Sequence, residues 1–158
     1  MKAIHWIIAA AALSFVQPAP TSAAQGDPEV IIYRFPGVRD NGGAANTGVA
    51  TVFHCTNFSG VTETLRFVTR NDAGSLLQNT TIGLIHLQTV TIATHDVNAY
   101  NEDKFLAAGV FVGQGTTAIA ATSINIICTA MTIDASTAAP VGVALRGIRF
   151  SPVPGSQE

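Results

Sequence analysis

The sequence predicts an all-β protein built as an antiparallel sandwich of two sheets. Short runs rich in Val, Ile, Thr and aromatic residues recur along the chain, with turn residues between them. Only one short stretch has the pattern of a helix. Two cysteines, Cys55 and Cys128, lie in the middle of an early and a late run. They follow a stretch with the features of an export signal, so an oxidising compartment and a disulfide are expected.

Residues 1–24 have the three parts of a cleavable signal peptide. Met1-Lys2 gives a positive start, residues 4–16 are mostly apolar, and small residues at 21–24 suit signal peptidase. The alternative is an uncleaved membrane anchor, but the apolar part is shorter than the roughly 20 residues that span a bilayer. We therefore expect a periplasmic or secreted protein, with one domain over residues 25–150 and a flexible tail over residues 151–158.

The first two predicted strands contribute side chains to the predicted core. Residues 29–35 are rich in β-branched and aromatic side chains and are expected to stop at the Pro-Gly pair that follows. Residues 48–58 come after a loop rich in Gly, Asn and Asp. Because side chains alternate along a strand, Phe53 and Cys55 share one face of this second run.

The third run, residues 62–70, alternates clearly between apolar and charged side chains. Leu65 and Phe67 lie on one face, and Arg66 and Arg70 lie on the other. The sequence Asn-Asp-Ala-Gly that follows predicts a hairpin, because Gly accepts the positive φ that such turns need.

The later part of the chain adds further strands and one helical turn. Residues 101–109 start with an Asn that can cap a helix, continue with two acidic residues at the positive end of the dipole, and end in Gly. The remaining runs are rich in Val, Ile, Thr and Ala and are predicted to be strands. They cover residues 75–77, 80–85, 89–94, 110–112, 116–122, 124–133 and 141–150.

Both cysteines lie among residues of the inward-facing type. Phe53 is two residues from Cys55, and Ile126 is two residues from Cys128. We therefore expect a bridge between them that pins the two facing sheets together. A bridge closing a loop of that length typically contributes about 2–4 kcal/mol to stability.

The order of these features resembles the immunoglobulin-like sandwich. It places a cysteine in an early strand, then a hairpin, then a partner cysteine in the penultimate strand. Residues 65–74 and 87–92 look like strand-and-turn segments of bacterial extracytoplasmic immunoglobulin-like modules. The chain departs from antibody domains in two ways, since Trp6 leaves with the signal and Ile126 stands at the position of the corner tyrosine. The resemblance implies a fold and no catalytic residues.

Composition excludes some classes of function. The chain has 8 Lys and Arg against 10 Asp and Glu, and charged residues make up 11% of it. It contains no basic run, so nucleic-acid binding is not expected. After residue 24 no apolar run is long enough for a transmembrane helix, so no stable membrane span is expected after cleavage.

Metal binding by histidine has little support in the sequence. His54, His86 and His95 survive cleavage, but in a strand His54 and Cys55 point to opposite faces. A blue-copper site needs a histidine close after its cysteine, and none follows Cys128. We therefore expect no metal site built on these histidines and no cofactor.

Calcium is the second metal hypothesis, because oxygen-rich side chains gather in two predicted loops. These residues match no EF-hand spacing, and turn and capping roles explain them without an ion, so no bound metal is expected. They are Asp40, Asn41, Asp96, Asn98, Glu102 and Asp103.

Two arginines are the candidate binding residues. Arg66 and Arg70 share the solvent face of one strand. In an immunoglobulin-like layout the Cys128 strand would be their neighbour, and Arg146 or Arg149 of the last strand would extend the same surface. Such a patch suits a carboxylate or a sulfated sugar. The alternative, which residue statistics favour, is a solvated surface whose charge is balanced by Glu63, Asp72 and Asp134.

The sequence thus favours a non-catalytic secreted or periplasmic protein that binds a partner, such as an anionic glycan or an envelope protein, or serves as an envelope component. A second hypothesis is a subunit of a surface fibre or adhesin assembled by strand addition, with residues 25–35 as the added strand. A small enzyme ranks third, because the chain has neither a Gly-x-Ser-x-Gly nor a His-Glu-x-x-His motif and no catalytic residue can be nominated.

Overall fold

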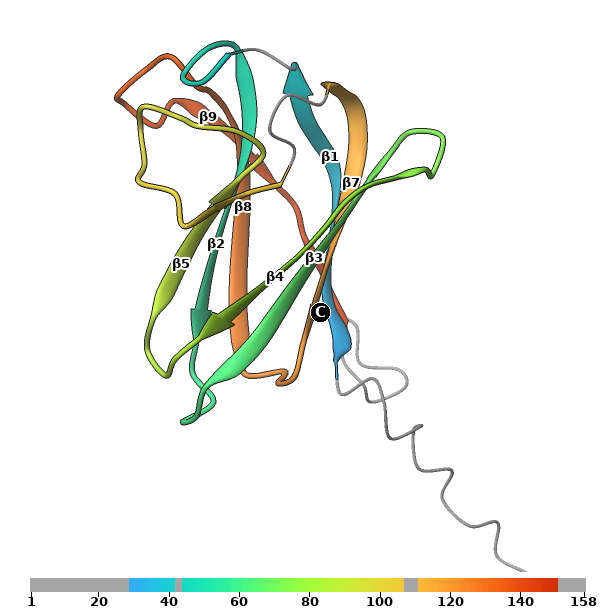
Figure 1. Ribbon diagram of the computed structural model, residues 1–158, viewed down its shortest axis with the longest axis vertical. Coiled ribbons are helices and arrows are strands. Elements are labelled where there is room, and N and C mark those ends of the chain that lie inside the picture. Colours follow the sequence, from blue (N-terminus) through green and yellow to red (C-terminus); the bar gives the residue numbers. More distant parts are fainter. Residues whose placement is uncertain (1–28, 42–43, 107–110, 151–158) are drawn as a thin grey trace, which may run out of the picture.

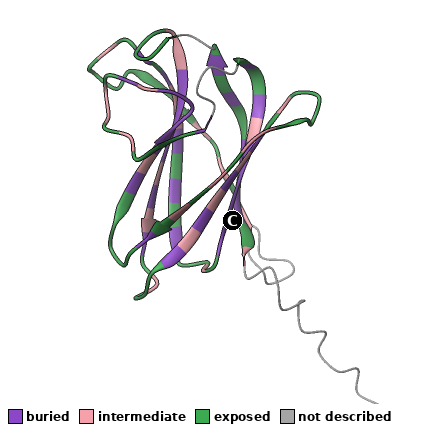
Figure 2. Ribbon diagram, in the orientation of Figure 1, coloured by how far each residue is buried: buried purple, intermediate pink, exposed green. Residues whose placement is uncertain are grey.

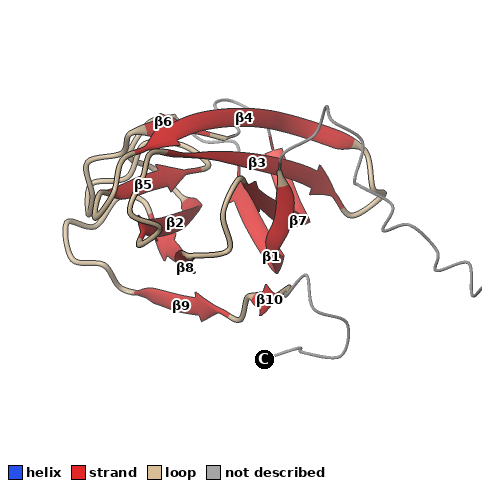
Figure 3. Ribbon diagram, turned by 90° about the horizontal axis from the view of Figure 1, so that it is seen from below, coloured by secondary structure: helices blue, strands red, loops and turns tan. Residues whose placement is uncertain are grey.

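The computed structural model describes residues 29–41, 44–106 and 111–150. These residues form strands joined by turns and loops, and none of them is helical (Figure 3), so the all-β prediction is confirmed. The strands are β1 Val30–Asn41, β2 Val49–Asn57, β3 Glu63–Asn71, β4 Leu76–Leu84, β5 Thr89–Ala93, β6 Lys104–Phe105, β7 Phe111–Ala121, β8 Ile126–Asp134, β9 Gly142–Leu145 and β10 Ile148–Arg149.

Two five-stranded sheets form the fold (Figure 1). The first sheet has the order β10-β1-β7-β3-β4, and the second sheet has the order β6-β5-β2-β8-β9. Neighbouring strands are antiparallel, except for the short parallel pairing of β5 with β6. Buried and exposed residues alternate along strands of both sheets (Figure 2), as expected when one face of each sheet is covered.

A row of aromatic rings joins the sheets. Phe35 of β1 and Phe67 of β3 come from the first sheet, and Phe53 of β2 lies between them from the second sheet. The ring centroids are 5.5 Å apart for Phe35 and Phe53, and 5.9 Å apart for Phe53 and Phe67. All three residues are at most 1% exposed. Edge-to-face packing of buried rings at this distance is favourable, so these residues hold the two sheets together.

The disulfide is present, but the prediction that it joins the two sheets is wrong. Cys55 and Cys128 are bonded, with an S–S distance of 2.12 Å. They lie directly opposite each other on β2 and β8, which are neighbours in the second sheet. The alternation pattern correctly places both side chains on inward faces. It does not determine whether two inward faces oppose each other across the core or lie side by side in one sheet.

The predicted helical turn is also wrong over its described part, and residues 107–109 lie outside the described chain. Residues 104–105 instead form β6, which pairs with β5. The two acidic residues expected at the helix start accept hydrogen bonds from elsewhere. Glu102 Oε1 accepts from the Val97 amide at 2.8 Å, and Asp103 Oδ2 accepts from the Thr91 amide at 2.7 Å. These contacts satisfy the carboxylates without a helix.

Several strand boundaries differ from the predicted runs. β1 does not stop at Pro36-Gly37 but continues through an irregular register, with Gly37 at φ 82°. Predicted neighbouring runs merge into β4 and into β7. The last run divides into β9, at the edge of the second sheet, and β10, at the edge of the first sheet. The chain therefore crosses between the sheets after Leu145.

Candidate functional site

The outer surface of the first sheet, which faces away from the core, carries both predicted binding residues. Arg66 is half-buried and Arg70 is exposed on β3, while Leu65 and Phe67 are fully buried on the opposite side of the strand. The alternation predicted for this strand is therefore confirmed. Whether the two arginines bind a partner stays a prediction.

A third arginine joins them through the strand order. Arg34 of β1 and Val68 of β3 both pair with Ala118, because β7 runs between the two strands. At the usual strand spacing the Cα atoms of Arg34 and Val68 lie about 10 Å apart, and those of Arg66 and Arg70 lie about 13 Å apart. The three arginines therefore form a triangle around Ala118, and we call this surface the arginine face.

The floor of the arginine face is made of small side chains of β7. Ala118 and Ala120 lie on the outer side of the sheet, yet they are only 8% and 3% exposed. Long neighbouring side chains must therefore cover them. Arginine side chains can supply such cover, because an apolar stem can lie along a surface while its guanidinium group stays in water.

One arginine of this face has a carboxylate partner. Arg66 Nε lies 2.7 Å from Glu29 Oε2, and the Arg66 side chain keeps 34% of its surface exposed. Over the described ranges, Glu29 is the only carboxylate in an ion pair with any of the three arginines. The face therefore carries more positive than negative charge.

The other two arginines are positioned by neutral groups. The guanidinium carbon of Arg34 lies 5.6 Å from the centre of the Phe150 ring. Arg70 Nη1 donates a hydrogen bond of 2.9 Å to the Gly74 carbonyl in the β3–β4 hairpin. Neither contact neutralises charge, so both guanidinium groups keep donors for an anion.

The prediction that Arg146 or Arg149 extends this surface is wrong. β3 pairs with β4 and β7, whereas β8, which carries Cys128, lies in the other sheet. Arg149 lies 5.8 Å from the centre of the mostly buried Tyr33 ring and donates to the Ile124 carbonyl. Arg146 is exposed between β9 and β10. Arg34 takes their place. Its position between the aromatic residues Tyr33 and Phe35 is a sequence signal that could have identified it as outward-facing.

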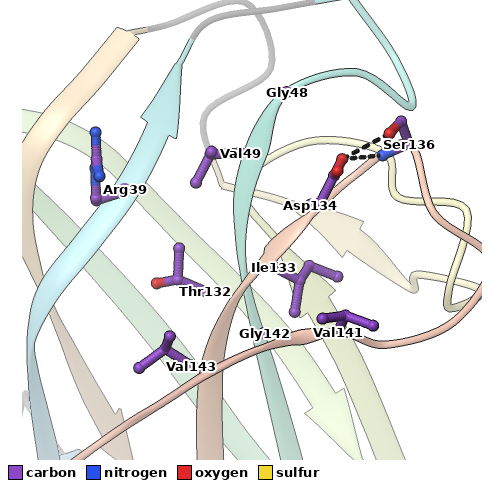
Figure 4. Close-up of a pocket in the computed structure, with 10 residues that line it drawn as sticks. All are labelled: Arg39, Gly48, Val49, Thr132, Ile133, Asp134, Ser136, Val141, Gly142 and Val143. Atoms are coloured by element: carbon purple, nitrogen blue, oxygen red, sulfur yellow. Dashed lines mark hydrogen bonds between the residues drawn. The ribbon is translucent and has the colours of Figure 1, made fainter.

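A separate groove of about 490 Å³ opens between the end of β1 and strands β2, β8 and β9 (Figure 4). Asp134 is the only carboxylate among its lining residues, which include no histidine. Both the amide and the hydroxyl of Ser136 donate to Asp134, and these hydrogen bonds lower the pKa of the carboxyl group. Its lining residues are Arg39, Gly48, Val49, Thr132, Ile133, Asp134, Ser136, Val141, Gly142 and Val143.

The histidines considered as metal ligands lie in three different places. His95 Nδ1 lies 2.8 Å from Asp40 Oδ2, and its Nε2 lies 3.0 Å from the Thr47 carbonyl. This buried contact ties the end of β1 to the loops before β2 and after β5. Asp40, which was a candidate calcium ligand, therefore contacts a histidine.

His54 and His86 are far from that pair in the fold. The ring of His54 packs edge-on against Tyr100, with centroids 4.6 Å apart, on the outer side of the second sheet. Burial lowers the pKa of His54. His86 Nδ1 accepts a hydrogen bond from the Gly60 amide at one end of the sandwich. Across the described residues, no three His, Cys, Asp or Glu side chains are grouped so as to hold a metal ion.

Comparison with known proteins gives no relatives. No protein-family model, curated protein or solved structure matches this chain. Within the described ranges, no helix is long and apolar enough to cross a membrane.

Proposed function

We propose that this protein is a non-catalytic binding protein that acts outside the cytoplasm, and that its arginine face binds an anionic polymer such as a carboxylated or sulfated glycan of the cell envelope. The observation that supports this most is the triangle of Arg34, Arg66 and Arg70 around a floor of small side chains, with one carboxylate partner among them. A disulfide suits the oxidising compartment that the signal sequence predicts.

The chemistry of arginine favours this class of partner. A guanidinium group presents a planar set of donors that matches carboxylate and sulfate oxygens. The Cα atoms of Arg66 and Arg70 lie about 13 Å apart, and Arg34 lies two strand spacings, about 10 Å, from the strand that carries them, so the three arginines cover an extended surface. A polymer with repeated anions therefore fits the face better than a free metabolite.

The expected affinity is modest and depends on salt. An exposed ion pair contributes roughly 0–1 kcal/mol, so several simultaneous contacts are needed. Exposed charges are screened over about 10 Å at 0.1 M ionic strength, so binding should weaken as salt is added.

We also propose that the sandwich is related in layout to the immunoglobulin fold. The pairings of β2 with β5 and of β3 with β7 correspond to the B–E and C–F pairings of that fold. The pairings of β1 with β7 and of β8 with β2 depart from it, and the second of these brings Cys128 beside Cys55.

A fibre subunit assembled by strand addition is the second candidate. The observation in its favour is the edge strand β9, where Val143 is 71% exposed beside the groove of Figure 4. The segment predicted from the sequence to be the added strand is already paired within its own chain, because residues 30–35 belong to β1 and pair with β7. An added strand would therefore have to come from elsewhere.

Retention on a dextran sulfate column tests the proposal. The Arg34→Ser/Arg70→Ser variant removes two charges of the arginine face and leaves the Arg66–Glu29 pair intact. Its matched control is Arg39→Ser/Arg146→Ser, which removes two exposed arginines outside this face. We expect the first variant to elute at clearly lower salt than the control. Equal elution of the two variants would count against the arginine face.

A further inference from the structure

Three turns meet at one end of the sandwich, at the lower end of Figure 1. They are residues 57–62, 85–88 and 122–125, which connect β2 to β3, β4 to β5 and β7 to β8. Backbone hydrogen bonds join them, since the Leu87 amide donates to the Asn57 carbonyl and the Phe58 amide donates to the Asn125 carbonyl. The three turns therefore form one surface.

Large apolar side chains are exposed on all three turns. Single exposed apolar residues are common on proteins, but a group of them at one place marks an interaction site. We call this group the apolar tip. Its members and their exposed fractions are Phe58 at 50%, Val61 at 62%, Ile85 at 59%, Leu87 at 63% and Ile124 at 42%.

The turns that carry the apolar tip contain no Lys, Arg, Asp or Glu. Their one titratable side chain, His86, accepts a hydrogen bond from the Gly60 amide through Nδ1 at 3.1 Å. Transfer of the tip to an apolar medium therefore buries no Lys, Arg, Asp or Glu side chain.

The backbone amides of the turns are largely satisfied within the tip itself. A turn exposed to water does not need this, whereas a segment that enters lipid must supply its own partners. Phe58, Ser59, Gly60, Val61, Ile85, Leu87, Gln88 and Asn125 donate their amides to groups of the same three turns.

Asn57 organises this internal network. It is fully buried, and its side-chain amide donates to the carbonyls of Val61 at 2.7 Å and Leu84 at 2.8 Å. Its Oδ1 accepts from the Ser59 amide. The buried Asn57 side chain thus ties the first turn to the end of β4, while the apolar side chains of the tip are exposed.

Leu87 adds an independent observation. Its φ of 62° lies in the left-handed region, which favours Gly and Asn over a branched side chain. Leu87 is exposed, so packing in the core does not explain a leucine here. A residue held in an unfavourable conformation at the surface points to a role in function.

We propose that the apolar tip inserts into the interfacial region of a lipid bilayer. A lipid surface fits the observations better than a protein groove, because the tip consists of turns at the end of the molecule, contains no Lys, Arg, Asp or Glu and satisfies most of its own amides. Interfacial binding of this kind scales with the apolar area that is buried. The tip and the arginine face are different surfaces, so the two proposals are independent.

Co-sedimentation with neutral phosphatidylcholine vesicles at high salt tests this proposal and excludes binding by the arginines. The tip variant is Phe58→Ser/Leu87→Asn, where Asn suits the left-handed backbone. The matched control is Leu76→Ser/Val143→Ser, which removes two exposed apolar residues outside the tip. We expect the tip variant to bind at least about tenfold more weakly than the parent, because each lost side chain removes buried apolar area. The control and the Arg34→Ser/Arg70→Ser variant should bind as the parent does.

Phe58→Trp gives a second measurement that leaves the tip apolar. Its fluorescence should shift to the blue when vesicles are added, relative to the parent spectrum, whereas Leu76→Trp should show no shift. The proposal is overturned if the parent does not bind neutral vesicles, or if the tip variant and the control bind equally. It is also overturned if the parent self-associates and the tip variant does not, while both bind vesicles equally. If the tip variant does not fold, the presence or absence of the Phe58→Trp shift decides.

Discussion

Cys55 of β2 lies directly opposite Cys128 of β8 in the same sheet, with their Cα atoms 4.2 Å apart. The bond therefore fixes the pairing of two central strands rather than the distance between the sheets. Contact between the sheets depends on the aromatic row of Phe35, Phe53 and Phe67. The two features make separate contributions that can be measured separately.

Loss of the disulfide should lower the free energy of unfolding by about 2–4 kcal/mol, because the bond restricts the unfolded chain. Urea denaturation of Cys55→Ala/Cys128→Ala under oxidising conditions checks this against the parent. Thiol titration of the exported, unreduced protein should detect no free thiol. Two free thiols would contradict the presence of the bond, and an unchanged denaturation midpoint would contradict its contribution to stability.

Truncation of the central ring should cost more than truncation of an exposed one. Phe53→Ala removes a side chain that contacts rings of the opposite sheet, and such changes cost about 3–5 kcal/mol. The control Phe111→Ala removes a ring that is 67% exposed and should change stability by no more than about 0.5 kcal/mol. Chemical denaturation of both variants gives the comparison, and similar losses would mean that the aromatic row does not join the sheets.

Alternation along the strands made part of this fold predictable. It placed Leu65 and Phe67 inward, Arg66 and Arg70 outward, and both cysteines toward the core, as the structure has them. It carries no information on which strands are neighbours. The predicted inter-sheet bridge and the predicted contribution of Arg146 or Arg149 failed for that single reason.

The candidate site could not be predicted in full for the same reason, because it depends on which strands are neighbours. Arg34 joins Arg66 and Arg70 only because β7, far along the chain, inserts between β1 and β3. The apolar tip likewise needs three distant turns to meet. The helical turn failed for another reason, since Glu102 and Asp103 accept hydrogen bonds from distant amides instead of capping a helix.

His54 should make stability depend on pH. Burial lowers the pKa of His54 in the folded protein below its ordinary value of 6.5, so the unfolded chain binds the proton more readily. The free energy of unfolding is therefore highest, with respect to His54, above about pH 6.5, and it decreases as the pH falls from there through the folded pKa. His54→Gln should flatten the pH profile of the melting temperature in this window, whereas His86→Gln should retain it. Identical profiles for His54→Gln and the parent would show that another group is responsible.

The most direct test of the arginine face is NMR mapping of the labelled protein during titration with dextran sulfate. We expect chemical-shift changes centred on Arg34, Val68, Ala118 and the side chains of Arg66 and Arg70. They should disappear in about 1 M salt, where the screening length falls to about 3 Å. Shifts confined to the groove beside Val143, or no shifts at low salt, would contradict the account.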